Sequence, residues 1–180
     1  MNNKTNNKLS KFLSLLLRHS PKTIGITLDE NGWTDVIDLI DKMNKNGEKI
    51  NMEILKEIVN TDNKSRYTFD ENYTKIRATQ GHSVKVELGY IPQKPPIILY
   101  HGTGKKYIES IFKDGIKKQS RNHVHLSGDK ETALKVGQRH GTPIILEILS
   151  EEMYNNNHQF FLSENGVWLT DYIPVEYIKK

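Results

Sequence analysis

The sequence predicts an α+β protein of two lobes. Pro92, Pro95 and Pro96 fall within five residues, and prolines so close together keep the chain extended and stop any helix. The chain before them is dominated by helical periodicity, whereas the chain after them carries several short apolar runs typical of strands. We therefore expect an N-terminal lobe over residues 1–91 and a C-terminal lobe, built on a bent β-sheet, over residues 92–180.

The first lobe contains three helical patterns, at about 8–19, 35–44 and 52–60. In the first pattern apolar side chains recur at i, i+3, i+4 and i+7, namely at Leu9, Phe12, Leu13 and Leu16. Thr34 and Asn51 stand in front of the second and third patterns, where their side-chain oxygens can cap a helix. Pro21 prevents the first helix from continuing, so Arg18 and His19 lie in its last turn.

A β-hairpin follows the third helix. Residues 66–69 and 73–77 alternate polar and apolar side chains, and Asp70, Glu71 and Asn72 between them are turn formers. Three helices and a hairpin predict a winged-helix-like lobe, a common nucleic-acid reader. The same order of elements also occurs in protein-interaction domains, so this pattern alone leaves both interpretations open.

The second lobe is expected to contain five strands and two helices. The strands are predicted at 97–101, 123–126, 143–149, 159–162 and 166–170, and the helices at 105–113 and 129–138. Gly115 is a suitable residue to end the first of these helices. No GxGxxG or GxxxxGK[ST] motif follows a strand, which argues against a Rossmann or P-loop nucleotide site.

Composition narrows the class of protein. The 180 residues include no cysteine, which excludes disulfides, thiol chemistry and Cys-ligated zinc, and no apolar run approaches the ~20 residues that span a bilayer. The polar N-terminus is not a signal peptide, so we expect a cytoplasmic protein with no membrane partner. The net charge of +4 is shared evenly by the two halves and is only weak evidence for a polyanionic partner.

Arginine is scarce, with five against 21 lysines, so each arginine is a candidate for a specific task. Arg18 and His19 could clamp a phosphate at the end of a buried helix or could simply decorate that helix end with favourable charge. Arg66 begins the hairpin, and its second strand leads into a donor-rich loop. The loop is a candidate phosphate or RNA site, formed by Arg77, Gln80, Gly81, His82 and Ser83. The alternative is a polar loop without a binding role.

Histidines mark the second lobe. The first strand is predicted to end in His101-Gly102-Thr103, where the glycine would let a ligand approach the backbone. In residues 123–126 two histidines alternate with Val124 and Leu126, and Arg121 precedes them. This pattern indicates a pocket for a polar, phosphorylated ligand. The alternative is that the histidines are buried and only form hydrogen bonds with backbone groups. No carboxylate or thiol stands at ligand spacing beside the histidines, so we expect no metal.

Taken together, these motifs resemble those of the RNA 2′-phosphotransferases. The resemblance covers nearly the whole chain and rests on several motifs in order, at 9–19, 28–33, 66–67, 77–83, 100–103, 121–127 and 165–170. It implies a winged-helix-like lobe followed by an ADP-ribosyltransferase-like lobe. It also implies that the partners are NAD⁺, as co-substrate, and RNA carrying a 2′-phosphate, and we expect the protein to be a monomer.

The resemblance assigns residues to roles. It places a catalytic tetrad on Arg18, His19, Arg66 and Arg121. It implies that NAD⁺ binds in the second lobe, to His101, Gly102, Thr103, His125, Ser127 and Val167. Val167 takes a position where protein-modifying relatives often have glutamate, although Glu164 lies close by in sequence.

The implied reaction has two steps. The RNA 2′-phosphate attacks the anomeric carbon of the nicotinamide ribose, and nicotinamide leaves. The ribose 2″-hydroxyl then attacks that phosphate, which releases 2′-hydroxyl RNA and ADP-ribose 1″,2″-cyclic phosphate. Fixed arginines would stabilise charge on the phosphoryl oxygens, and His19 would act in the second step.

Two other functions remain open at this point. An ADP-ribosyltransferase could use the same pocket, stop after the first step and modify a nucleic-acid end or another acceptor. A winged-helix regulator without activity is the third hypothesis. The sequence does not name the RNA, which is spliced tRNA in organisms whose tRNA-splicing ligases leave a 2′-phosphate.

Overall fold

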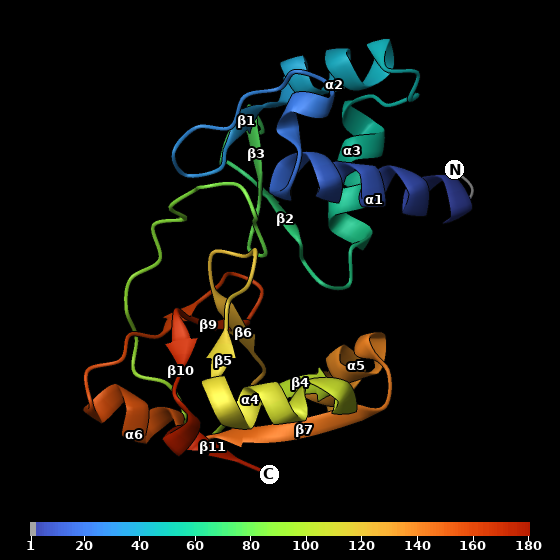
Figure 1. The fold of residues 1–180 in the computed structure, drawn as a ribbon. Helices are drawn as coiled ribbons and strands as arrows, with labels where there is room; N and C mark the ends of the chain where they lie inside the picture. The colour runs from blue at the N-terminus through green and yellow to red at the C-terminus, as the bar shows by residue number, and fades with distance from the viewer. Residues whose placement is uncertain (1–2) are drawn as a thin grey trace. The chain divides into compact units, whose positions relative to one another are not determined.

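A computed structural model describes residues 3–180, with side chains from Asn6 onward, and shows a mixed α/β protein with several small antiparallel sheets (Figure 1). Its internal contacts divide the chain into two compact units, Met1–Gly89 and Tyr90–Lys180. Among the described residues, no helix combines the length and apolar character that crossing a bilayer requires.

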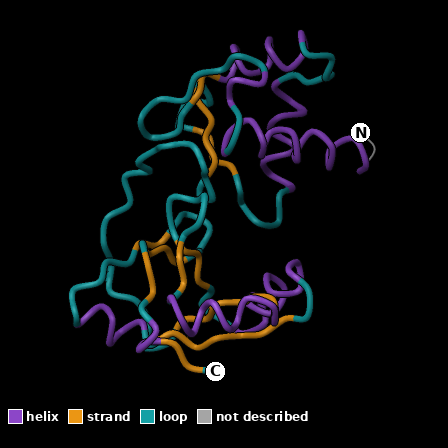
Figure 2. Tube along the Cα trace, in the orientation of Figure 1, coloured by secondary structure: helices purple, strands orange, loops and turns teal. Residues whose placement is uncertain are grey.

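The first unit packs three helices beside a three-stranded antiparallel sheet (Figures 1 and 2). The helices are α1 (Asn3–Arg18), α2 (Val36–Lys45) and α3 (Met52–Thr61). The strands follow the order β1 (Thr34–Asp35), β3 (Lys75–Ala78) and β2 (Tyr67–Phe69), so the predicted hairpin is confirmed and gains a short third strand. Four leucines of α1 are almost completely buried in the core of this unit, at Leu9, Leu13, Leu16 and Leu17.

Helix boundaries in this unit follow their caps. Asn51 caps α3 as predicted, since its side chain accepts a hydrogen bond of 2.9 Å from the backbone N–H of Ile54. The prediction of Thr34 as the cap of α2 is wrong. Thr34 pairs with Ile76 in the sheet, and the Asp35 carboxylate takes the N–H of Asp38 instead, at 2.8 Å. An acidic cap also suits the positive end of the helix dipole.

The second unit contains three small sheets. The first sheet has the strand order β11 (Ile178–Lys179), β7 (Pro143–Ile148) and β4 (Leu99–Gly104). The second has the order β6 (Val124–Leu126), β9 (Trp168–Thr170) and β8 (Phe161–Leu162). The third pairs β10 (Tyr172–Ile173) with β5 (Ile116–Lys117). The helices are α4 (Ile108–Asp114), α5 (Lys130–Gly137) and α6 (Ser150–Asn155). The predicted elements are present, whereas α6 and the two-residue strands β5, β10 and β11 were not expected.

The predicted first strand of this unit differs in extent. It was expected at 97–101 with His101-Gly102-Thr103 at its end, but β4 runs on to Gly104 and pairs with β7 throughout. The three residues therefore lie inside a strand. The partner strand sets this boundary, because each further residue of β4 gains a paired neighbour down to Pro143.

The two faces of β4 have different surroundings. A side chain added at Gly102 would collide with the backbone carbonyl of Ala133 in α5 and lie 2.9 Å from the backbone nitrogen of Gly137. Gly102 thus allows close packing of helix on strand; that it also lets a ligand approach the backbone stays a prediction. Since side chains alternate along a strand, His101 and Thr103 lie on the face away from α5.

This packing leads to a prediction for stability. Gly102→Ala should destabilise the protein by about 3 kcal/mol or more, because the methyl group can be accommodated only if α5 moves off the strand. Gly128→Ala is the control, since an added Cβ there meets nothing within 4 Å. Urea or thermal unfolding measures both. Equal unfolding midpoints for the two variants would contradict this account of β4.

Candidate functional site

The first group of candidate residues gathers where α1 ends. The backbone carbonyl of Arg18 accepts hydrogen bonds from the N–H of Ser83 at 2.8 Å and of Val84 at 3.3 Å. Helix C-termini leave carbonyls without partners, and here the loop that follows β3 supplies the donors. The end of α1 and this loop therefore form one fixed substructure.

Gly81 brings the loop against the Arg18 side chain. Its φ of +88° lies in the left-handed region, which favours glycine. A side chain added at Gly81 would lie 3.6 Å from Nη1 of Arg18, so the guanidinium packs directly over this glycine. The left-handed backbone at Gly81 therefore helps to place the arginine.

The imidazole of His19 is oriented by the same loop. Its Nδ1 shares a hydrogen bond of 2.9 Å with Oγ of Ser83, while the residue as a whole is exposed. A hydrogen bond to one ring nitrogen restricts rotation of the ring. His19 is thus held at the surface in a defined orientation, as a group that acts on a bound ligand requires.

Arg66 joins this cluster through its backbone, and Asp62 holds its side chain. Its carbonyl accepts from the N–H of Thr79 at 2.9 Å and lies 3.5 Å from Nη2 of Arg18. Its guanidinium pairs with the carboxylate of Asp62, whose side chain is only 4% exposed, while the Arg66 side chain remains 30% exposed. The first unit therefore brings together three of the four predicted catalytic residues, Arg18, His19 and Arg66.

Asp62 was missed in the sequence analysis. It stands four residues before Arg66, and an acid and a base at that spacing often pair. That spacing was the available signal. The Asp62 carboxylate also accepts the backbone N–H of Arg66 at 2.6 Å, so it fixes both the chain and the side chain of this arginine.

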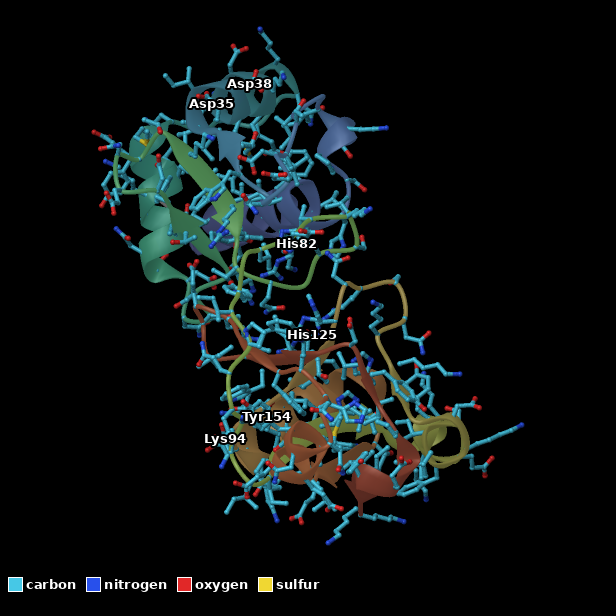
Figure 3. The ribbon with its side chains drawn as sticks, turned by 90° about the vertical axis from the view of Figure 1, so that its left-hand side faces the viewer. Asp35, Asp38, His82, Lys94, His125 and Tyr154 are labelled. Atoms are coloured by element: carbon cyan, nitrogen blue, oxygen red, sulfur yellow. The ribbon has the colours of Figure 1, made fainter. Side chains whose placement is uncertain are left out.

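His82 points into the interior, and Figure 3 marks its place on the loop. The residue is 1% exposed, and within residues 3–180 neither ring nitrogen has a hydrogen-bond partner. Burial, together with the positive charges of Arg18, His19 and Arg77, lowers the pKa of His82 from 6.5 to about 4. His82 is therefore neutral near pH 7 and does not reach solvent.

Arg77 is also buried, at 9% exposure. Its Nη1 donates to the carbonyl of Leu88 at 3.2 Å and approaches that of Asn31 at 3.5 Å, and its guanidinium lies 4.5 Å from the ring centre of Trp33. These contacts suit a structural tie between chain segments. Of the predicted RNA-binding loop, Gln80 and Ser83 keep accessible side chains.

The second group of candidates surrounds a junction of two sheets. Tyr100 and Ser127 exchange backbone hydrogen bonds of 2.9 and 2.8 Å, which join β4 to the end of β6. The next residue, His101, is held by a hydrogen bond of 3.2 Å between Nδ1 and the carbonyl of His125. A carbonyl can only accept, so Nδ1 carries the proton and Nε2 is an acceptor. Burial also lowers the pKa of His101, which favours this neutral form.

The remaining candidates of the second unit lie on the same sheets. His125, labelled in Figure 3, is half-buried on β6, and Thr103 is almost completely buried on β4. Val167 precedes β9, and its backbone N–H donates to Ser163 Oγ at 3.0 Å, which closes the turn. His101, Ser127 and His125 thus meet at one junction.

Arg121 is exposed on the turn before β6. Its backbone N–H donates to the carbonyl of Lys118 at 3.1 Å. Its predicted meeting with the three basic residues of the first unit stays a prediction.

Comparison with known proteins gives a consistent result. A family model described as "RNA 2'-phosphotransferase, Tpt1 / KptA family" matches residues 4–172. A relative from Flavobacterium johnsoniae is 54% identical over 179 residues, which cover 99% of this chain and 98% of the relative. Relatives from Fusobacterium nucleatum and Agrobacterium fabrum are 57% and 47% identical over 96% and 94% of this chain, and over 97% and 91% of their own lengths. All three are described as a probable RNA 2′-phosphotransferase.

The burial of His82 predicts a specific pH dependence of stability. In the unfolded chain this imidazole takes up a proton as the pH falls below about 6.5, whereas in the folded protein it does so only near pH 4. Acidification therefore favours the unfolded state in this window, and the contribution lost is on the order of 3 kcal/mol. His82→Leu should lack this component of acid destabilisation.

The measurement is urea unfolding at several pH values between 7 and 4. His140→Leu, at an exposed histidine, is the control and should follow the wild type. If acidification lowered the free energy of unfolding of the wild type and of His82→Leu equally, His82 would not be the group that causes the acid destabilisation.

Proposed function

The chain belongs to the RNA 2′-phosphotransferase family and is a transferase enzyme, and we propose that it removes a 2′-phosphate from RNA in an NAD⁺-dependent reaction of two steps. The proposal includes a winged-helix-like first lobe, an ADP-ribosyltransferase-like second lobe and a monomeric, cytoplasmic protein. In organisms whose tRNA splicing leaves a 2′-phosphate, we propose spliced tRNA as the substrate.

The observation that carries this proposal is the cluster of Arg18, His19 and Arg66 in the first unit. The loop after β3 fixes the first two, and Asp62 fixes the third. Guanidinium groups match the geometry of phosphate oxygens, and a clamp whose members are held in advance loses little entropy on binding. This cluster is therefore suited to a phosphate dianion.

The residues of the second unit fit the co-substrate. With Nδ1 of His101 committed to the His125 carbonyl, Nε2 is an acceptor for a ribose hydroxyl. Thr103 shares that face of β4, and Ser127 and His125 border the same junction. NAD⁺ would supply a ribose carbon that is open to attack because its nicotinamide departs as a neutral molecule.

The basic residues have separate tasks in the two steps. A phosphate is already nucleophilic near neutral pH, so Arg18 and Arg66 serve the first step mainly by placing it. In the second step negative charge redistributes over the phosphoryl oxygens, and the guanidinium groups of Arg18, Arg66 and Arg121 would stabilise it. His19 moves a proton or donates a hydrogen bond in that step.

The decisive experiment incubates the protein with a 2′-phosphorylated oligoribonucleotide, with and without NAD⁺, and follows both products by mass spectrometry. We expect 2′-hydroxyl RNA, nicotinamide and ADP-ribose 1″,2″-cyclic phosphate, all dependent on NAD⁺. A stable ADP-ribose adduct on the RNA would favour an ADP-ribosyltransferase instead. Dephosphorylation without NAD⁺ would contradict the proposed co-substrate.

The clamp predicts the effect of removing single arginines. Arg18→Ala and Arg121→Ala should each lower turnover by about 100-fold or more, because charge on the phosphoryl oxygens loses a fixed donor. Arg139→Ala is the control, since this fifth arginine is exposed and has no assigned task. Thermal unfolding checks that each variant folds. Turnover at the wild-type rate in Arg121→Ala would refute its place in the clamp.

The assignment of His19 predicts a change in the balance of the two steps. His19→Ala should accumulate RNA that carries ADP-ribose on its 2′-phosphate, because the loss of the imidazole slows the second step more than the first. Single-turnover quenched reactions, resolved on denaturing gels, measure both rates. Equal slowing of the two steps would count against this role.

A further inference from the structure

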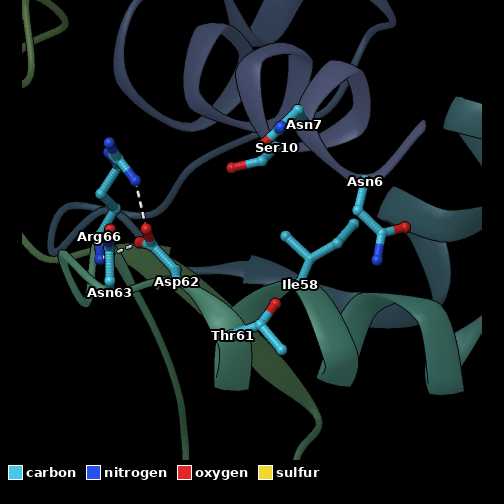
Figure 4. A pocket seen from close by; sticks show the side chains of 8 residues that line it. All are labelled: Asn6, Asn7, Ser10, Ile58, Thr61, Asp62, Asn63 and Arg66. Atoms are coloured by element: carbon cyan, nitrogen blue, oxygen red, sulfur yellow. Dashed lines mark hydrogen bonds and ion pairs between the residues drawn. The ribbon is translucent and has the colours of Figure 1, made fainter. Parts of the chain in front are cut away.

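A hollow of about 250 Å³ opens beside Arg66 in the first unit, between α1 and the end of α3 (Figure 4). Asn7 and Ser10 line it from α1, and Thr61 and Ile58 line it from α3. Arg66 borders the same hollow. None of the roles assigned above uses this space, although it shares a wall with the proposed phosphate clamp.

The lining of the hollow is polar but almost uncharged. Besides Ser10 and Thr61 it presents the side-chain amides of Asn6, Asn7 and Asn63. Its one acid, Asp62, already pairs with its one base, Arg66. Amides and hydroxyls donate and accept hydrogen bonds without charge, so they match base edges and ribose hydroxyls better than a phosphate. No aromatic residue lines the hollow, so recognition there would rest on hydrogen bonds.

The hollow and the clamp lie along one face of α1 and share Arg66. Asn7, Ser14 and Arg18 recur at intervals of seven and four residues, which places them on one face of the helix. At 1.5 Å per residue, Asn7 lies about 16 Å from Arg18 along the helix axis. Arg66 joins the two regions, because it lines the hollow while its carbonyl lies 3.5 Å from the Arg18 guanidinium. A chain bound at the clamp can therefore extend into the hollow.

We propose that this hollow binds the sugar and base of a nucleotide next to the 2′-phosphorylated one, so that the enzyme recognises a short single-stranded RNA segment. The proposal rests on the proposed function for the identity of the ligand. The volume of the hollow suits one nucleoside. The uncharged amides and hydroxyls that line the hollow complement the sugar and base of RNA, which lie between its charged phosphates. The phosphate goes to the arginines and the neighbouring nucleoside to the amides.

The test compares two substrates that differ only in the neighbour. One is a nucleoside 2′-phosphate, and the other is a trinucleotide with a 2′-phosphate on its middle residue. Asn63→Ala and Asn7→Ala should each raise KM for the trinucleotide roughly three- to tenfold, the equivalent of one lost hydrogen bond, with kcat unchanged. The same variants should leave KM for the nucleoside 2′-phosphate unchanged.

Asn60→Ala is the matched control. Asn60 is an exposed asparagine of α3 that stands three residues before Asn63 and does not line the hollow. Its variant should behave as the wild type with both substrates. If Asn63→Ala and Asn7→Ala matched Asn60→Ala, or raised KM for both substrates equally, the hollow would not bind the neighbouring nucleotide.

Binding of the fluorescently labelled trinucleotide without NAD⁺, followed by anisotropy, separates this inference from the proposed function. If the wild-type protein converted neither substrate, this result would contradict the proposed function. Weaker binding of the trinucleotide by Asn63→Ala than by Asn60→Ala would still support the hollow as an RNA site. Equal binding by the two variants would overturn it.

Discussion

The candidate site of the first unit depends on the capping of α1 by the loop that follows β3. Two backbone N–H groups of that loop reach the Arg18 carbonyl, at 2.8 and 3.3 Å. Without them the last turn of α1 would be free to fray, and the two basic side chains on it would have no defined position. The left-handed backbone at Gly81 and the hydrogen bond between Ser83 and His19 then set the side chains. Backbone contacts thus establish the site before any ligand arrives.

This arrangement has a cost that is visible at His82. A buried imidazole whose nitrogens lack partners among the described residues typically costs about 1–3 kcal/mol. Besides burial, the positive charges of Arg18, His19 and Arg77 lower its pKa, which shows that this region has a positive electrostatic potential. The same potential attracts an anion to the exposed side of the cluster. The lowered pKa of His82 and the attraction of this region for anions therefore share an electrostatic source.

Local sequence predicted what local forces decide. Helix α3 and its Asn51 cap and the hairpin of the first unit all follow from side chains within a few residues of one another. The features that the sequence did not reveal depend on distant partners. The length of β4 is set by β7, and the reason for Gly102 is the backbone of α5. The basic residues of the site were named from motifs, and the spacing of Asp62 to Arg66 was a local signal that was missed, but the hollow beside Arg66 required the packing of α1 against α3.

Asp62 resolves an apparent conflict in this site. An arginine meant for phosphate loses attraction when a carboxylate already pairs with it, yet the pair also holds the guanidinium in one orientation. The exposed fractions of the two side chains show which of these effects is larger. The Asp62 side chain is only 4% exposed, whereas 30% of the Arg66 side chain remains accessible. The carboxylate therefore binds one edge of the guanidinium from the interior and leaves its other N–H groups accessible. A positioned donor needs less reorganisation than a mobile one, and preorganisation of this kind is what stabilises charge in a phosphoryl-transfer transition state.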